Sequence, residues 1–181
     1  MIELLNKISG FELLVLDFIS ENLTNPILDM LMSFASALCN HGEIWIAVAL
    51  FMLCFRKTRK AGLAVILSLI LGYFIGNLTL KPMIARIRPY ELSAYQLIIS
   101  KPSDFSFPSG HALASFESAF AIYLNNKKFG IYALILASVI SFSRLYLYVH
   151  YPTDIIAGIV LGILIAVVSN KLTNKYIFFS K

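Results

Sequence analysis

Six residues between positions 81 and 154 have side chains suited to handling phosphate. They are three cations, two histidines and one carboxylate: Lys81, Arg88, Arg144, His111, His150 and Asp154. Lysine and arginine neutralise phosphoryl oxygens, and the planar guanidinium group can hold two of them at once. A carboxylate bonded to one ring nitrogen of a histidine fixes its tautomer and leaves the other nitrogen as a nucleophile. The set therefore predicts a site that binds phosphate and transfers it.

The spacing of these residues supports the same chemistry. A helix that begins at Pro108–His111 would offer free backbone N–H groups and its positive end to an anion, with Ser109 and Gly110 at the point of approach. His150 and Asp154 are four positions apart. They share a face if one helix carries both, and they remain near neighbours if Pro152 turns the chain between them.

The composition places this site in a membrane protein. Of 181 residues, 59% are apolar and 14% charged, and the mean hydropathy is +0.78. Ala61–Leu80 holds no charge and is long enough to cross a bilayer core as a helix. We predict an all-α integral membrane fold, a helical bundle of five to six transmembrane helices preceded by N-terminal interfacial helices. The spans are expected near Glu43–Phe55, Ala61–Leu80, Gly110–Leu124, Phe129–Val149 and Thr153–Asn170.

One membrane-embedded domain is expected over residues 1–181. Its parts are N-terminal interfacial or partly spanning helices (1–40), a catalytic helical core (41–170) and a tail (171–181). Polar positions of the first helix fall near a helical period, which favours an amphipathic helix in the interface, although a tilted span stays open. Asn25 and Pro26 read as the N-cap and first position of a second helix. Cys39 and Cys54 are expected to be small packing residues without a disulfide.

Charge predicts the orientation. The segments Arg56–Lys60, Asn125–Lys128 and the tail from Lys171 hold four, two and three Lys or Arg, whereas all ten acidic residues lie elsewhere. Positive residues mark the cytoplasmic side, so the Pro82–Pro108 loop is expected outside. The phosphate-handling residues then gather at the outer ends of the helices. The expected location is the cytoplasmic (inner) membrane of a bacterium, with the site facing the periplasm or outside.

The motifs resemble a known family. Lys81-(six residues)-Arg88-Pro89, Pro108-Ser109-Gly110-His111 and Ser143-Arg144-(five residues)-His150-(three residues)-Asp154 look like the three-part signature of the type 2 phosphatidic acid phosphatase superfamily. That superfamily includes phosphatidylglycerophosphate, undecaprenyl diphosphate and lipid A phosphatases. The resemblance covers Lys81–Asp154, and residues 1–40 are the least family-like part.

The resemblance implies a role for each residue. His150 resembles the nucleophile that forms a phosphohistidine, Asp154 the carboxylate that orients it, and His111 the general acid. Lys81, Arg88, Ser109, Gly110 and Arg144 resemble the phosphate clamp. The implied function is a metal-independent phosphatase, without a cofactor, that acts on a phospholipid or an isoprenoid or glycolipid phosphate. Asp154 is the only acid in the motifs, too few for a carboxylate metal cage.

Other polar and aromatic residues have simpler interpretations. We expect His41 to be a polar cap and Arg86 an interfacial anchor or lipid headgroup contact, with a catalytic role as the alternative for Arg86. Glu117, two turns into a span, either bonds to a neighbouring helix or lines the cavity. Three tyrosines are expected in an interfacial aromatic belt: Tyr146, Tyr148 and Tyr151.

Other classes of protein could carry some of the same residues. A phosphotransferase would use the same phosphohistidine. A transporter with an intramembrane charge relay would carry its charges near the midplane, and here they cluster at one end. A scaffold needs no cation cluster, and the hydropathy excludes a soluble haloperoxidase. The lipid stays open between phosphatidylglycerophosphate, undecaprenyl diphosphate and lipid A 1-phosphate. One undecaprenyl branch tends to carry Asp where this chain has Gly110.

Overall fold

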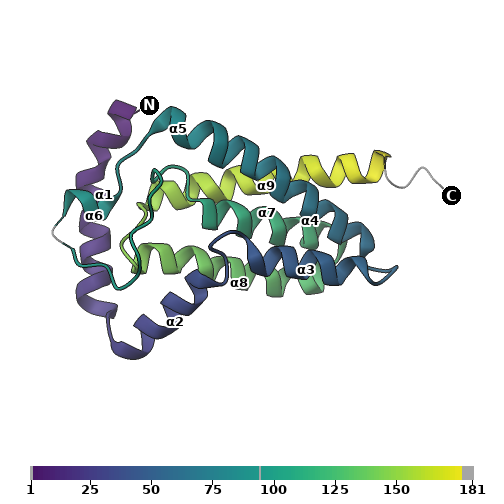
Figure 1. Ribbon diagram of the computed structural model, residues 1–181, viewed down its shortest axis with the longest axis horizontal. Helices are drawn as coiled ribbons and strands as arrows, with labels where there is room; N and C mark the ends of the chain where they lie inside the picture. Colours follow the sequence, from purple (N-terminus) through teal and green to yellow (C-terminus); the bar gives the residue numbers. More distant parts are fainter. Residues whose placement is uncertain (1, 94, 177–181) are drawn as a thin grey trace.

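The described part of the chain folds entirely into helices and loops. The computed structural model describes residues 2–93 and 95–176, with side chains from residue 8 onward, so the last five residues of the predicted tail lie outside it. Figure 1 shows the helices in chain order. They are α1 (Ile2–Leu23), α2 (Pro26–Ala37), α3 (Glu43–Leu53), α4 (Arg59–Gly72), the π-helical η1 (Tyr73–Leu80), α5 (Lys81–Ile84), α6 (Pro89–Leu92), α7 (Gly110–Asn125), α8 (Lys127–Tyr146) and α9 (Pro152–Tyr176).

The body of the molecule is a bundle of α3, α4 with η1, α7, α8 and α9, which run back and forth along one axis (Figure 1). Helix α7 is central, and glycines let α9 approach it closely. A Cβ atom on Gly162 would lie 2.9 Å from the backbone oxygen of Leu113, so only glycine fits there. On another side, Trp45 of α3 donates a 3.0 Å hydrogen bond to Ser115 of α7. Close packing and a buried hydrogen bond therefore hold α9 and α3 against α7.

The bundle has the character of a membrane protein. Three helical stretches are long and apolar enough to cross a bilayer: Arg59–Leu92, Lys127–Tyr146 and Pro152–Tyr176. Large apolar side chains such as Ile135, Val160 and Leu164 are exposed on its outside. The predicted all-α membrane fold is confirmed, and all five expected spans exist as helices. Two of them, α3 with 11 residues and α7 with 16, are shorter than a full span.

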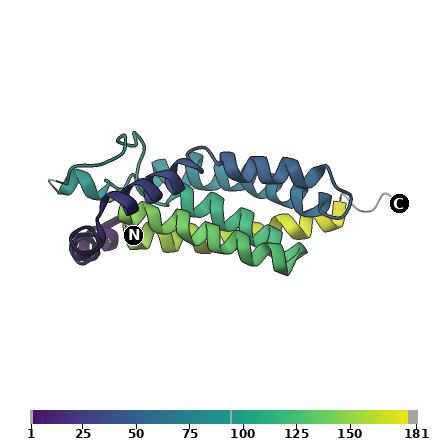
Figure 2. The same cartoon turned by 90° about the horizontal axis from the view of Figure 1, so that it is seen from below.

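The N-terminal helices cover one end of the bundle. Helix α1 stands across the bundle axis in Figure 1 and is seen nearly end-on in Figure 2, while α2 leads back toward α3. Phe11, Leu14 and Phe18 point outward and are more than 60% exposed, whereas Leu16 and Ile19 are buried against the bundle. Asn25 caps α2 as predicted, accepting a 3.0 Å bond from the Leu28 amide. This arrangement agrees with an interfacial α1 rather than a spanning one.

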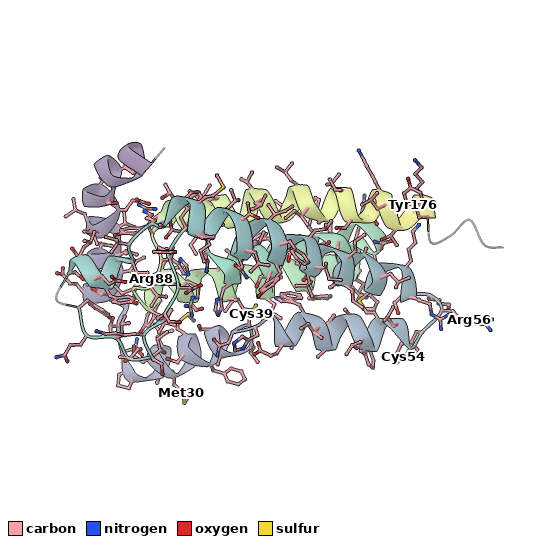
Figure 3. The ribbon with its side chains drawn as sticks, turned by 45° about the horizontal axis from the view of Figure 1, so that its top comes forward. Met30, Cys39, Cys54, Arg56, Arg88 and Tyr176 are labelled. Atoms are coloured by element: carbon pink, nitrogen blue, oxygen red, sulfur yellow. The ribbon has the colours of Figure 1, made fainter. Side chains whose placement is uncertain are left out.

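The two ends of the bundle differ in charge. Arg88 lies at the end covered by α1, whereas Arg56 and Tyr176 lie at the opposite end (Figure 3). The basic turns predicted for one side of the membrane are therefore together, away from the phosphate-handling residues. Both cysteines are free; Cys39 is buried, but Cys54 is exposed and is not the packing residue that we expected.

Candidate active site

The predicted site residues converge at the α1-covered end of the bundle. Lys81 begins α5, Arg88 follows it in the loop before α6, His111 is in the first turn of α7, Arg144 is in the last turn of α8, and Asp154 is in the first turn of α9. A cavity of about 1190 Å³ opens among them; its lining includes Lys81, Arg88, Gly110, His111, Arg144 and His150. Apart from His111, which is half-buried, the charged and histidine side chains of the set are less than 10% exposed.

His150 lies in the tight turn between α8 and α9. The turn is closed at Tyr148, which adopts a left-handed conformation with φ of +60°, and α9 starts only at Pro152. Of the two arrangements considered for His150 and Asp154, the chain turn is the one found. The ring Nε2 is 3.2 Å from Nη1 of Arg88. Because a guanidinium group can only donate, Nε2 must be the acceptor, and the proton of the neutral ring belongs on Nδ1.

The opposite edge of the His150 ring faces Asp154. The distance from Nδ1 to Oδ2 of Asp154 is 3.5 Å, longer than a usual N–H···O bond, and the Ser106 hydroxyl is also 3.5 Å from Nδ1. Burial, together with Arg88, Arg144 and Lys81, lowers the pKa of His150 well below its usual range. The ring is therefore held neutral, with Nε2 unprotonated and Nδ1 directed at a carboxylate, which is the arrangement that a nucleophilic Nε2 would require.

Asp154 is fixed by several donors. Its Oδ2 accepts a 2.9 Å bond from the Tyr151 amide and a bond from the Ser106 hydroxyl, and its Oδ1 accepts a 2.6 Å bond from Arg86. Sequence reasoning missed Ser106, although it stands only two residues before the motif that begins at Pro108. Its contribution could not be inferred from spacing because the partner is 48 positions away.

Two of the clamp cations hold a carboxylate of the protein itself. Arg88 donates from Nη2 to Oδ1 of Asp104 at 2.6 Å, and Lys81 forms an ion pair with the other carboxylate oxygen. Burial alone would oppose ionisation of Asp104, but Lys81 and Arg88 outweigh it and hold the pKa of this carboxyl far below its usual range. Arg88 is fixed further by the Val149 carbonyl oxygen, at 2.6 Å. The Asp104 carboxylate thus bridges Lys81 and Arg88. The Arg88 guanidinium group that binds it is the one that also contacts His150.

The other half of the site is attached to α2. Nε2 of His111 is 3.2 Å from the carbonyl oxygen of Ser36, and Arg144 donates to the hydroxyl of the same serine. Ser36 is 75 positions from His111 and 108 from Arg144. Residues 1–40, the least family-like part of the chain, therefore help to orient a predicted catalytic histidine and a predicted clamp arginine.

Ser109 and Gly110 occupy different positions in the site. Ser109 is fully buried; its hydroxyl caps α7 by accepting from the Ala112 amide at 3.5 Å, and its own amide donates to the Asp154 carbonyl oxygen. It is not part of the cavity lining, so the structure does not place its hydroxyl as a direct phosphate contact. Gly110 does line the cavity, and a Cβ atom on it would lie 3.2 Å from Oδ1 of Asn77.

Two expectations about neighbouring residues were wrong. Arg86 is not an interfacial anchor: it is 4% exposed and forms ion pairs with Glu12 and Asp154. The tyrosines expected in an aromatic belt are at most 2% exposed, because α1 covers them. Tyr146 and Tyr148 donate 2.6 Å bonds to Asp29 and Asp17. A signal was present for Arg86, since Glu12 is a carboxylate inside an apolar run and an arginine is a natural partner for it.

Two further polar residues, Glu117 and His41, differ in burial. Glu117 is 1% exposed and lies against Gly72, where any Cβ atom would overlap its carboxyl group; it also lines the cavity. Of the two interpretations given to it, lining the cavity agrees with this position, whereas its buried Oε2 has no hydrogen-bond partner among the described residues. His41 is exposed before α3 and pairs with Glu43, and the adjacent Gly42 adopts a left-handed conformation with φ of +80°.

The chain is similar in sequence and in fold to proteins of one family. The model of the PAP2 superfamily matches residues 61–178. A protein of Sulfolobus acidocaldarius named undecaprenyl-diphosphatase is 35% identical over 133 residues, which are 72% of this chain and 64%, just under two thirds, of that relative.

Two solved structures share the fold. One is the transmembrane PAP2 type phosphatidylglycerolphosphate phosphatase from Bacillus subtilis, with a TM-score of 0.75, 23% identity and coverage of 96% of this chain and 90% of that one. The other is Aquifex aeolicus LpxE, with a TM-score of 0.71, 26% identity and coverage of 87% and 93%. The family match contains all three motifs. It therefore includes the predicted site residues Lys81, Arg88, His111, Arg144, His150 and Asp154. This chain is a member of the PAP2 superfamily.

Proposed function

We propose that the protein is a metal-independent lipid phosphate phosphatase that acts through a phosphohistidine at the outer membrane–water interface. The observation that carries the proposal is the Asp104 carboxylate bridging Lys81 and Arg88. The bridge marks a place where these cations bind an anion, on the same guanidinium group that contacts Nε2 of His150. A phosphoryl group that displaces Asp104 would present its phosphorus to this nitrogen.

The chemistry follows from the hydrogen bonds around the two histidines. Nε2 of His150 attacks phosphorus, while the bond from phosphorus to the leaving oxygen breaks. Asp154 stabilises the positive charge that develops on the His150 ring, and the clamp cations stabilise the charge on the phosphoryl oxygens. His111 gives a proton to the leaving oxygen. Water, with its proton taken by His111, then attacks the phosphohistidine, releasing inorganic phosphate and restoring both rings.

The shape of the cavity supports a lipid substrate. From the cations it extends along α3, α4 and η1, where its lining includes Ile46, Leu50, Ile70 and Phe74. These four side chains are 46–56% exposed on the apolar outside of the bundle. One end of the cavity is therefore cationic and the other reaches a lipid-facing surface, which suits a molecule with a phosphate head and an apolar tail.

The experiment is phosphate release from purified, detergent-solubilised protein in EDTA. Undecaprenyl diphosphate is tested first, since the relative with 35% identity is named for it, followed by phosphatidylglycerophosphate and lipid A 1-phosphate. We expect turnover of at least one of them, inhibition by vanadate and complete loss in His150→Ala. His41→Ala is the matched control: His41 lines the cavity, but its side chain is 89% exposed and pairs with Glu43, so we expect it to take no part in handling phosphate. Wild-type protein inactive on all three, or active only after Mg²⁺ is added, would contradict the proposal.

A further inference from the structure

Arg86 is the centre of a buried polar network behind the predicted catalytic residues. It lies in the loop after α5 and donates to Asp154 at 2.6 Å, to the Thr153 hydroxyl at 2.8 Å, to Glu12 at 2.5 Å and to Ser9 at 3.1 Å. Its guanidinium carbon lies 3.8 Å above the ring of Tyr151. The residues come from α1, α9 and two loops, so the network joins the N-terminal helix to the site.

Glu12 contributes a second connection to the same place. Its Oε1 accepts from both the amide and the hydroxyl of Thr153, at 2.9 Å and 2.6 Å. A carboxylate at this position satisfies an N–H group in the first turn of α9 and is stabilised by the positive end of that helix. Glu12 thus binds the turn that carries Asp154 directly, and it binds Asp154 indirectly through Arg86.

The charges explain why the arginine is needed. Glu12 and Asp154 are both at most 4% exposed, and two buried carboxylates without a cation would be strongly disfavoured. Arg86 donates to Oδ1 of Asp154, which leaves Oδ2 facing Nδ1 of His150. Removing the guanidinium group would free the carboxylate to rotate or to take up a proton, and either change would deprive the His150 ring of its partner.

We propose that Arg86, held by Glu12, is a positioning residue that keeps Asp154 ionised and directed at His150. This inference rests on the function proposed above. Arg86 is not part of the lining of the large cavity, so it acts through Asp154 rather than on the substrate. Helix α1 then contributes to the active site through Glu12.

The test is steady-state hydrolysis of p-nitrophenyl phosphate by purified Arg86→Lys and Arg86→Ala proteins. We expect kcat to fall about 10- to 100-fold, as when an outer partner that orients a metal-bound histidine is removed. KM should stay within about twofold of wild type, because the phosphate clamp is intact. Arg56→Ala is the matched control: it also removes one arginine, but from the opposite end of the bundle.

Chemical rescue separates positioning from general stability. A cavity of about 210 Å³ lies beside Arg86, lined by Ser9, Ile87, Leu92 and Tyr151, and gives a small cation room to enter. Ethylguanidinium ions should restore kcat of Arg86→Ala at least in part, whereas the same concentration of NaCl should not. Thermal unfolding of each variant is measured in the same detergent.

Glu12→Gln tests the connection to α1 without an arginine change. It should lower kcat without raising KM, and its effect should not add to that of Arg86→Ala, since both act on Asp154. The inference fails if Arg86→Lys and Glu12→Gln keep wild-type kcat, or if KM rises while kcat is unchanged. It also fails if activity and thermal stability are lost together and ethylguanidinium restores neither. Wild-type protein that hydrolyses neither p-nitrophenyl phosphate nor any of the three lipids would instead overturn the proposed function.

Discussion

At the scale of single residues, the two histidines differ in what holds them. His150 is fixed between Arg88 on one ring edge and Asp154 with Ser106 on the other. His111 is bound through Nε2 to a backbone carbonyl oxygen of α2, which leaves Nδ1 as the nitrogen that we assign to the leaving group. One ring is surrounded by groups that favour a neutral nucleophile, and the other has a nitrogen available for proton transfer.

Substituting each histidine should therefore give a different dependence on the leaving group. His111→Ala should slow hydrolysis of a lipid phosphate by roughly 10²- to 10⁴-fold, because an alkoxide needs a proton to leave. On p-nitrophenyl phosphate, whose leaving group needs none, it should recover much of the first-step rate, seen as a burst or as labelled phosphohistidine. His150→Ala should form no phosphoenzyme on either substrate. The reverse pattern would mean that the two roles are exchanged.

The burial of His150 predicts how stability depends on pH. An unfolded histidine takes up a proton as the pH falls below 6.5, whereas the lowered pKa of His150 keeps it neutral in the fold. The unfolded state then binds more protons, so stability decreases below pH 6.5, by up to about 1.4 kcal/mol for each pH unit until the folded pKa is reached. Thermal unfolding of His150→Gln between pH 7 and 5 should show a weaker decrease than wild type.

The control for this measurement is His41→Gln, which changes a histidine that is exposed rather than buried. It should leave the pH dependence of unfolding as in wild type. An unchanged pH dependence in His150→Gln would argue against a buried neutral ring.

Asp104 should behave as a competitor of the phosphate group. In Asp104→Asn, the substrate no longer has to displace a carboxylate from Lys81 and Arg88. KM for p-nitrophenyl phosphate and the inhibition constant for vanadate should both fall. The expected factor is on the order of two to ten, given that the carboxylate is half-exposed and its ion pairs are partly screened. A raised KM with a lowered kcat would show instead that Asp104 orients the cations.

At the scale of elements, the loops and helix ends place the chemistry, and the packing of long helices places those ends. Segment η1 changes the helical repeat just before Lys81, and π-helical turns often occur at functional sites. Helices α7 and α9, which carry His111 and Asp154, are packed so closely that only glycine is accommodated at Gly158 and Gly162.

Close packing of α7 and α9 makes Gly162 sensitive to the smallest substitution. A Cβ atom there would be 2.9 Å from two backbone atoms of α7, and overpacking of this kind costs about 1–3 kcal/mol. Gly162→Ala should therefore lower the unfolding temperature and the activity together. Gly10→Ala in α1 is the matched control: a Cβ atom at Gly10 meets nothing within 4 Å, and alanine favours a helix by about 1 kcal/mol. Equal stability of the two variants would contradict the close contact.

At the scale of the whole molecule, the bundle separates charge along its axis. The Arg56 turn and the end of α9 lie at one end, and the site with its covering helices lies at the other (Figure 3). Under the rule that basic segments stay in the cytoplasm, we propose that the site faces the outside. That residues 1–181 act as a single unit stays a prediction.

Cysteine labelling of intact cells tests this orientation. In a variant with Cys39 and Cys54 replaced by alanine, a new cysteine at Ser103 should react with a membrane-impermeant reagent. One at Asn126, in the turn between α7 and α8, should react only after the cells are broken. Both positions are exposed, so accessibility within the protein does not distinguish them. The opposite labelling pattern would place the active site at the inner leaflet.

The membrane fold and the helices of the bundle could be predicted from the sequence alone, and so could the set of residues that meet at the candidate site. These properties are local: an apolar run long enough for a span, a cap at Asn25, and two reactive residues four positions apart can each be read from a short segment. Charge counts in the turns were enough to place the site opposite the basic end.

Which other residues support the site depends on the tertiary structure. Arg86 was expected at the membrane interface, and it is buried because Glu12 arrives from 74 positions away with a compensating charge. Ser36 likewise contacts His111 and Arg144, which are distant in sequence. The tyrosines are buried because α1 lies across the end of the bundle. Burying an ionised group is favourable only when a partner is present. Because hydropathy and spacing describe one segment at a time, they cannot show that such a partner will be there.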